Sequence, residues 1–561
     1  MTPICNISEE VLVSPQKIIS GYINETDWRV NENSNEGYSY ASLLSHVSST
    51  VVAEYTLSEI YPKEISETHR NGDFHIHDLS CGIIGYCAGW SLGQLLKMGF
   101  VGSAGRASAA PAKHFDTAVG QMVNFMCTLQ TEWAGAQAFS SFDTLLAPFV
   151  KFDKLSYREV KQKVQQLIFG LNIASRWGQT PFTNLTLDWT VPEDLKDMGV
   201  VVGGEVSSQW CYGDFKEEMA VINRAFLECM AAGDRDGRIF TFPIPTYNIT
   251  RDFDWDDSNA ELLFEVTGKY GIPYFQNFMN SELDPRDVRS MCCRLSLDLT
   301  RLEHKTGGLF GAGEQTGSLG VVTINMPRLG HTCSTEEFYG RLDELMELAK
   351  DSLEIKRGVV QENMDRGLMP YSSLYLGTLD NHFNTIGLVG MHECCLNHLG
   401  CGINMPEGHR FALQVLDHMR EKMTAFQQET GHMYNLEATP AEGTSYRLAK
   451  IDIEKYPDIL TSGTTSSPYY TNSTQLPVGY TDDIFEAFDM QDELQCKYTG
   501  GTVLHGFIGE RIEDPKQTAK LVKALATNYH LPYFTLTPTF SICPEHGYLS
   551  GKHETCPVCV G

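Results

Sequence analysis

The first part of the chain carries the spacing of amphipathic helices. Apolar residues recur every three or four positions in "ASLLSHVSSTVVAEYTLSEIY" (41–61) and along the stretch 114–150, which is the period of a helix with one buried face. Between these two stretches, "GDFHIHDLSCGIIGYCAGW" (72–90) alternates and then becomes apolar. That pattern predicts a buried strand that ends in a loop.

After the proline-rich "TFPIPTYNITRD" (241–252), short apolar runs alternate with amphipathic helices. The run "GSLGVVTINMPR" (317–328) reads as a strand, residues 336–360 as a helix, and "FNTIGLVGMHECCLN" (383–397) as the next strand and helix. Such alternation predicts an α/β architecture built around a central sheet or barrel.

The end of the chain differs from the rest in composition. From about Phe540 the sequence is short, polar and rich in Cys, His, Pro and Gly. We therefore divide the chain into a large catalytic domain, 1–539, and a small C-terminal module, 540–561. At 561 residues the whole chain exceeds the size at which a single core stops growing.

Charge and hydropathy narrow the class of protein. A net charge of −28 argues against a general nucleic-acid or anionic-membrane binder, because a phosphate backbone requires a basic face. No apolar run approaches the ~20 residues that span a bilayer, and "MTPICNISEE" lacks a signal-peptide pattern. We expect a cytoplasmic protein whose 16 cysteines serve as thiols, metal ligands or catalysts.

The C-terminal module has the spacing of a zinc site. "CPEHGYLSGKHETCPVC" places Cys543 and His546 three residues apart, and Cys556 and Cys559 likewise. Each pair can supply two ligands from one tight turn, as tetrahedral zinc requires. His553 is the alternative to His546 as a ligand. With four protein ligands the site is closed, so we expect structural rather than catalytic zinc.

A second histidine pair lies in "HIHDL" and has two interpretations. His75 and His77 share one face of the predicted strand, with Asp78 adjacent, so they could bind a metal. Nothing else in the sequence completes that ligand set. We therefore favour hydrogen bonding that positions a neighbouring loop.

The unusual "MCCRL" motif raises the question of thiol chemistry. Cys292 and Cys293 are adjacent, and a disulfide between neighbours is strained. Buried cysteines are commonly inert hydrophobes. Cys87 in "GYCAGW" and Cys496 in "LQCKYTGG" nevertheless lie near other predicted strand ends and a Gly-rich loop.

Several strings in the chain resemble the anaerobic (class III) ribonucleoside-triphosphate reductases, a family of glycyl-radical enzymes. They run in family order from about residue 30 to the end, and they are "NENSN", "GDFHIHDL", "YCAGW", "FPIPTYNI", "MCCRL", "GSLGVVTINMPR", "YYTNSTQLPV", "LQCKYTGGTVLHGFIGE" and the terminal zinc pairs.

The resemblance implies a ten-stranded α/β barrel, surrounded by helices, with a finger loop that carries the reactive cysteine into its centre. The family's thiyl cysteine falls on Cys293, with Met291 two residues before it. Cys87 matches the second active-site cysteine, which donates the hydrogen that replaces the 2′-hydroxyl, and Cys81 is its competitor. The implied reaction reduces ribonucleotides to 2′-deoxyribonucleotides. The resemblance implies triphosphates as the substrates.

The reductant is a point where the chain departs from part of the family. Members that use formate carry an asparagine where this chain has Ser318, so the resemblance disfavours formate. Cys292 and Cys496 are extra thiols, and a thioredoxin or glutaredoxin-like protein could reduce such a pair by thiol–disulfide exchange. Glu393 in "GMHECC" could transfer protons or form a structural ion pair.

The family's radical glycine follows the zinc pairs in a segment that has no match here, since the sequence stops at "CPVCVG". We assign the glycyl radical to no residue of the chain, and expect it on a trimmed tail or a separate polypeptide. The resemblance also implies a homodimer and a radical-SAM iron–sulfur activase. The start of the chain is too short for the ATP-cone of many relatives.

Nucleotide contacts are expected in Gly/Ser/Thr-rich loops, where backbone N–H groups hold phosphates. The candidates are Thr471, Asn472, Ser473, Thr499, Gly500, Gly501 and Thr502. The region around 113–121 resembles the dimer interface where a dNTP or ATP effector selects the substrate, with Lys113 and His114 as contacts. Simple turn chemistry explains each of these residues equally well.

Two other functions compete with the reductase. A formate acetyltransferase-like glycyl-radical enzyme also uses adjacent cysteines, but that family lacks the terminal zinc pairs. The other alternative is a zinc-stabilised nucleotide-binding protein without catalysis.

Overall fold

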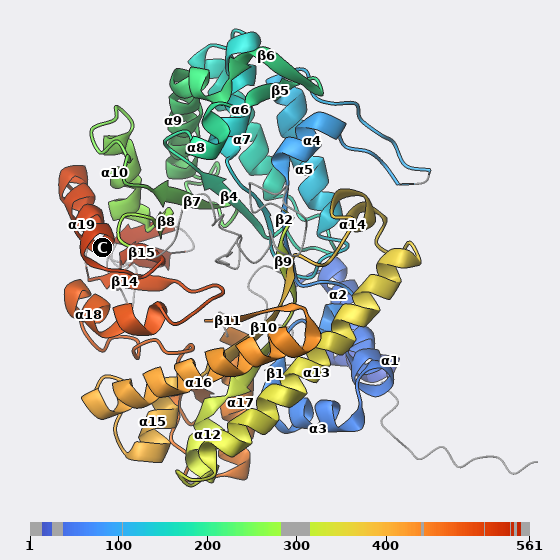
Figure 1. Ribbon diagram of the computed structural model, residues 1–561, viewed down its shortest axis with the longest axis vertical. Helices are drawn as coiled ribbons and strands as arrows, with labels where there is room; N and C mark the ends of the chain where they lie inside the picture. Colours follow the sequence, from blue (N-terminus) through green and yellow to red (C-terminus); the bar gives the residue numbers. More distant parts are fainter. Residues whose placement is uncertain are drawn as a thin grey trace, which may run out of the picture.

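The computed structural model describes residues 14–24, 38–103, 105–281, 315–438, 442–509 and 511–538, together with the backbone of 540–543 and 547–550. Within these ranges a large sheet is surrounded by helices (Figure 1). The predicted mixed α/β fold around a large central sheet is therefore confirmed. None of the helices in these ranges is both long enough and apolar enough to cross a membrane.

The central sheet consists of two parallel halves that meet in antiparallel pairs. All neighbours within each half are parallel, whereas β2 pairs with β9 and β8 with β15 in the antiparallel sense. The first half contains β2 (Cys87–Trp90), β3 (Gln137–Phe139), β4 (Thr183–Leu187), β7 (Ile244–Ile249) and β8 (Tyr274–Asn277). The second contains β9 (Gly317–Asn325), β10 (His382–Val389), β11 (Met433–Glu437), β14 (Leu504–Ile508) and β15 (Tyr533–Pro538).

Main-chain hydrogen bonds bring the two ends of this ten-strand path together. The N–H of Gly500 donates to the carbonyl of Leu436 over 2.7 Å, and the N–H of Ala438 donates to the carbonyl of Gly501, also over 2.7 Å. The segment before β14 therefore lies against β11. Figure 1 shows the strands arranged in a ring, and we call this arrangement the barrel and its inside the lumen.

The remaining strands lie beside the barrel. β1 (Phe74–Ile76) pairs with the end of β9. The other strands form three two-stranded sheets: β5 (Gly199–Val202) with β6 (Glu205–Cys211), β12 (Ser462–Thr464) with β13 (Ser467–Tyr469), and β16 (Phe540–Cys543) with β17 (Gly547–Ser550).

Helices pack on the outer face of the barrel because that face carries the apolar side chains of each strand. Val322 and Ile386, for example, join one buried cluster with residues of the long helix α13. The helices are α1 (Pro15–Ile23), α2 (Tyr40–Tyr55), α3 (Lys63–Asn71), α4 (Leu92–Met98), α5 (Phe115–Leu129), α6 (Phe142–Phe152), α7 (Tyr157–Leu171), α8 (Glu193–Lys196), α9 (Lys216–Ala232), α10 (Ala260–Tyr270), α12 (Met326–Thr332), α13 (Phe338–Asp365), α14 (Pro370–Tyr375), α15 (Met391–Leu399), α16 (Pro406–Thr430), α17 (Glu442–Lys455), α18 (Ile484–Gln495) and α19 (Pro515–Asn528).

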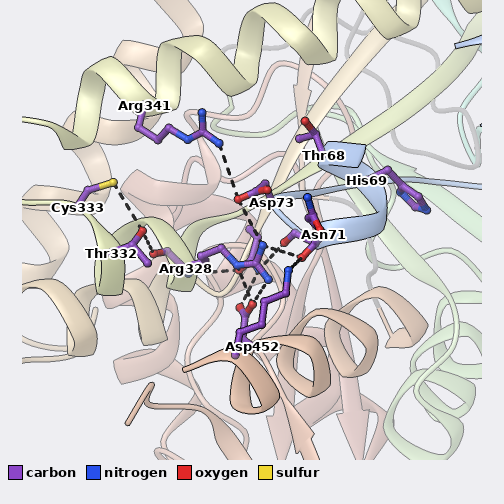
Figure 2. Close-up of polar contacts among 12 residues, drawn as sticks. Thr68, His69, Asn71, Asp73, Arg328, Thr332, Cys333, Arg341 and Asp452 are labelled. Carbon is purple, nitrogen blue, oxygen red and sulfur yellow. Dashed lines mark hydrogen bonds and ion pairs between the residues drawn. The ribbon is translucent and has the colours of Figure 1, made fainter. Parts of the chain in front are cut away.

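A buried ion pair fastens α17 to the end of β9. Figure 2 shows Arg328, at the start of α12, beside Asp452 of α17. The Nε of Arg328 donates to Asp452 over 2.8 Å, and Asp452 also accepts from Asn325 at 2.8 Å and from the Tyr470 hydroxyl at 2.7 Å. Asp452 is completely buried, so every part of its carboxylate depends on these donors.

Candidate active site

Cys87 lies at the beginning of β2, where the two halves of the barrel meet. It pairs with Ser318 of β9 in the antiparallel register, and its side chain is 1% exposed. The main-chain N–H of Ala136 points at the Cys87 sulfur over 3.3 Å. A Cβ at Gly135 would stand 2.9 Å from that sulfur, so glycine there lets the neighbouring strand approach the thiol closely.

Ser318 continues a line of polar side chains from Cys87 onto the next strand. Its hydroxyl lies 2.7 Å from the hydroxyl of Thr385 in β10, and both residues are completely buried. Outward-facing residues farther along these two strands, such as Val322 and Ile386, are apolar and pack on helices. The polar line therefore occupies the opposite face of the sheet, toward the lumen. A buried thiol beside buried hydroxyls suits a polar substrate held away from water.

The positions assigned to the thiyl chemistry lie outside the described residues. Met291, Cys292 and Cys293 fall within 282–314, between β8 and β9. Their roles stay predictions. The described strands that flank this segment, β8 and β9, both belong to the barrel.

Cys81, the competitor of Cys87, lies in a 3-10 turn before β2 and is partly buried. Burial raises the pKa of its thiol. Lys356 of α13 is 2% exposed, and its charge interacts electrostatically with the thiols of Cys81 and Cys87. Because a Cβ at Gly320 would stand 2.9 Å from Cδ of Lys356, the glycine admits this side chain against β9. Burial also lowers the pKa of Lys356.

Glu393 is completely buried in the first turn of α15 and has a structural set of partners. Its carboxylate accepts from the Thr471 hydroxyl at 2.6 Å, from the Thr471 N–H at 3.1 Å and from the Ser462 hydroxyl at 2.5 Å. These bonds hold the loop 471–473 against the helix. Both interpretations of Glu393, proton transfer and a structural ion pair, stay predictions.

The loop 471–473 covers the N-terminus of α15. The N–H of Gly390 donates to the carbonyl of Thr471 at 2.8 Å, and the N–H of Met391 donates to the carbonyl of Ser473 at 3.0 Å. Asn472 is exposed, whereas its two neighbours are buried. The predicted phosphate contacts of this loop stay predictions.

The Gly-rich segment 499–502 lies where the barrel closes. The Thr499 hydroxyl accepts from the N–H of Leu436 at 2.9 Å, and the Thr502 hydroxyl donates to Gln495. Gly500 and Gly501 supply the two main-chain bonds to β11. The segment therefore has a structural role, and its predicted role in substrate binding stays a prediction.

Cys496, Lys113 and His114 lie on exposed surface. Cys496 caps the end of α18. His114 precedes α5, and its Nδ1 lies 2.7 Å from Asp153, while the stem of Lys113 lies near Gly203 at the turn between β5 and β6. Their exposure leaves each accessible to a partner protein or an effector, which stays a prediction for all three.

The histidines of "HIHDL" contact one another and other side chains. The His75 and His77 rings meet edge to face at 4.9 Å, and Nε2 of His77 lies 2.7 Å from the Thr323 hydroxyl. Burial lowers the pKa of His77 to about 4, so its ring is neutral at neutral pH. Among the described residues no group of His, Cys, Asp and Glu could hold a metal ion. The interpretation as a positioning pair fits this geometry.

The predicted zinc ligands belong to the C-terminal module. Cys543 ends β16, but its side chain is outside the described residues, as are His546, His553, Cys556 and Cys559. The backbone of β16 and β17 forms an antiparallel hairpin in which Cys543 pairs with Gly547.

Two buried polar residues of the barrel were not among the site residues predicted from the sequence. Thr385 and Asn435 occur within apolar strands and belong to no motif. The alternation of "HFNTIGLV" and "MYNLE" could have placed them on one face. Their proximity to Cys87 depends on strand order, which the pattern does not contain.

A ring of strands with a buried thiol on its inner wall suits chemistry that must be shielded from water. A family model, "Anaerobic ribonucleoside-triphosphate reductase", matches residues 32–561. The chain belongs to this family and is an oxidoreductase that reduces ribonucleotides.

Curated relatives match nearly the whole chain. The anaerobic ribonucleoside-triphosphate reductase of Enterobacteria phage T4 is 24% identical over 603 residues, covering 97% of this chain and 91% of the relative. The enzyme of the same name from Escherichia coli K12 is 22% identical over 613 residues, covering 96% of this chain and 79% of the relative.

Solved structures share the fold. The anaerobic ribonucleotide reductase from Thermotoga maritima with dATP in its specificity site is 21% identical, with a TM-score of 0.76, covering 97% of this chain and 91% of that one. A hydroxyproline dehydratase from Clostridioides difficile, with 12% identity and a TM-score of 0.55, covers 94% and 83% of the two chains. The second likeness is looser.

Proposed function

We propose that the chain reduces ribonucleoside triphosphates by thiyl-radical chemistry inside the barrel. Cys293 would remove the 3′-hydrogen of the ribose, and Cys87 would donate the hydrogen that replaces the 2′-hydroxyl, which leaves as water. The supporting observation is the burial of Cys87 on the inner wall beside Ser318 and Thr385. A buried site protects a sulfur radical from solvent.

The reaction balances if a dithiol supplies the electrons. One ribonucleotide and two thiols yield one deoxyribonucleotide, one water and one disulfide, which is a two-electron reduction. We propose a thioredoxin or glutaredoxin-like protein as the dithiol donor, with formate as the alternative. The hydroxyl of Ser318 is already engaged with Thr385 at 2.7 Å, and it offers no amide to a small carboxylate.

Other parts of the proposed enzyme come from the family. A protein glycyl radical, assigned to no residue of this sequence, would generate the thiyl radical once a radical-SAM activase has formed it. The active form would be a homodimer in which a dNTP or ATP effector contacts Lys113 and His114. Thr471, Asn472, Ser473 and the segment 499–502 would hold substrate phosphates.

A direct test measures deoxynucleotide formation. The full-length gene product is incubated without oxygen with a radical-SAM activase, S-adenosylmethionine, thioredoxin and its reductase, CTP and dATP. We chose CTP and dATP because both are bound in a structure of the Thermotoga maritima enzyme. We expect dCTP, together with a glycyl doublet in the EPR spectrum. CTP binding without dCTP, in protein that shows the doublet, would favour a nucleotide-binding role.

We also propose that the C-terminal module holds one structural zinc through Cys543, His546, Cys556 and Cys559. Metal analysis of the purified chain is expected to find about one zinc per chain. Cys556→Ser should lose the metal and lower the stability of the chain, whereas the exposed Cys496→Ser should retain both. Unchanged zinc content in Cys556→Ser would contradict the assignment.

A further inference from the structure

Four side chains from four neighbouring strands form one transverse row. Cys87 pairs with Ser318, the Ser318 hydroxyl bonds to Thr385, and Thr385 pairs with Asn435 of β11 in parallel register. We call these four residues the polar row. They are between 0% and 1% exposed.

The polar row faces the lumen. Directly paired residues in a sheet point to the same face, and successive residues alternate between faces. Leu436, next to Asn435, packs into the apolar cluster under α13 and α16, as does Ile386, next to Thr385. Asn435 and Thr385 therefore point the other way. The row crosses four of the ten strands, so the curvature of the barrel turns its two ends toward each other.

Asn435 is the member of the row whose hydrogen-bonding groups are not used. Within the described part of the chain, neither its Nδ2 nor its Oδ1 has a partner. Burial of an amide without hydrogen-bond partners lowers the stability of a protein. Such an amide is therefore expected to bond to a ligand or to water. Gly500 closes one side, since a Cβ there would stand 2.9 Å from Nδ2.

We propose that Asn435 hydrogen-bonds the 3′-hydroxyl of the substrate ribose. This inference rests on the proposed function. In that function Cys87, at the other end of the row, donates the hydrogen that replaces the 2′-hydroxyl. The two hydroxyls of a ribose are neighbours on the same side of its ring, so a ribose that lies over the row can turn one hydroxyl toward Cys87 and the other toward Asn435. A hydroxyl both donates and accepts, and an amide offers one group of each kind.

The choice of an amide matters for the chemistry. Removal of the 3′-hydrogen acts on the carbon that bears this hydroxyl, so a fixed 3′-hydroxyl holds that carbon at one place in the lumen. Asn435 would thus be a positioning residue that binds the substrate and takes no part in electron transfer. Its amide stays neutral across the working pH range.

The experiment uses substitutions of Asn435 and three nucleotides. Binding of CTP, 2′-deoxy-CTP and 3′-deoxy-CTP is measured by calorimetry at saturating dATP, with wild type and Asn435→Val. Losing one buried hydrogen bond should weaken binding of CTP by about 5- to 20-fold. The same loss is expected for 2′-deoxy-CTP, and little change for 3′-deoxy-CTP, which lacks the hydroxyl that Asn435 contacts.

Stability supplies a second readout. Because the amide has no partner among the described residues, Asn435→Val should unfold at a temperature equal to or higher than wild type in the absence of nucleotide. A structural role would lower that temperature. A clear loss of stability in Asn435→Val, or the same loss of affinity for all three nucleotides, would overturn the inference.

Asn384→Ala is the matched control. Asn384 is equally buried and neighbours Thr385 on the same strand, but its amide donates outward to Glu354 over 2.7 Å. Its replacement should lower stability and leave the ratio of affinities for CTP and 3′-deoxy-CTP unchanged.

If Asn435→Val instead recovers wild-type affinity with 2′-deoxy-CTP, then Asn435 contacts the 2′-hydroxyl and the assignment is wrong.

The inference and the proposed function fail differently. If wild type neither binds nor reduces CTP, the proposed function is wrong. If wild type binds and reduces CTP and Asn435→Val binds all three nucleotides as wild type does, only the inference is wrong. In that case an internal water, which needs two to four polar partners, would account for the unpaired amide.

Discussion

Replacement of Cys87 by alanine is expected to abolish deoxynucleotide formation, with a loss of at least about 1,000-fold, because removing one member of a set of reacting groups disables the whole set. CTP should still bind, since the thiol is one small group on a large wall. The glycyl EPR signal should also persist, because in the proposed reaction Cys87 acts after the radical has formed. The measurement compares dCTP yield, CTP affinity and radical content in one activated preparation.

Cys81→Ala is the control for this prediction. Cys81 lies six positions before Cys87 and is less buried, and it does not pair with Ser318. Its replacement should leave turnover within a few-fold of wild type. The reverse result, with Cys81→Ala inactive and Cys87→Ala active, would transfer the hydrogen-donor role to Cys81.

Replacement of Asp452 by alanine is expected to lower the free energy of unfolding by about 3–5 kcal/mol, the cost of leaving a buried ionic partner uncompensated. Among the described residues, the Arg328 guanidinium would keep Asp73, at 3.3 Å, as a charged partner. Asn325 and Tyr470 would lose an acceptor at the same time. Urea unfolding followed by both fluorescence and circular dichroism measures the change and tests whether the transition is two-state.

A carboxylate on the surface provides the comparison. Asp343 accepts from His418 at 2.8 Å, but 38% of the Asp343 side chain is exposed. Asp343→Ala should cost less than about 1 kcal/mol. Equal effects of the two substitutions would show that burial does not set the energy of the Asp452 network.

The order of strands and helices could be predicted from the sequence because periodicity reports local structure. The strand 317–325 and the helix at 338–365 lie almost where the pattern placed them. The burial of Cys87 also follows from its apolar surroundings. The resemblance to the anaerobic reductases extended these local predictions to a family.

The composition of the polar row could not be predicted, because it depends on which strands become neighbours. Thr385 and Asn435 are separated by 50 positions in the chain and share no motif, and only the parallel pairing of β10 with β11 joins them. Glu393 shows the opposite limitation. As an acidic residue in a cysteine-rich motif it could transfer protons or form a structural ion pair, and the motif does not contain the packing behind its three hydrogen bonds to Thr471 and Ser462.

The antiparallel junction between β2 and β9 has a consequence for how the molecule must be assembled. Cys87 belongs to the half of the barrel that is synthesised first, and Ser318, Thr385 and Asn435 to the half synthesised later. Neither half contains the whole polar row. A shift of one residue at this junction would turn Cys87 away from Ser318, so the polar row, and with it the proposed ribose site, forms only when the two halves dock in a single alignment.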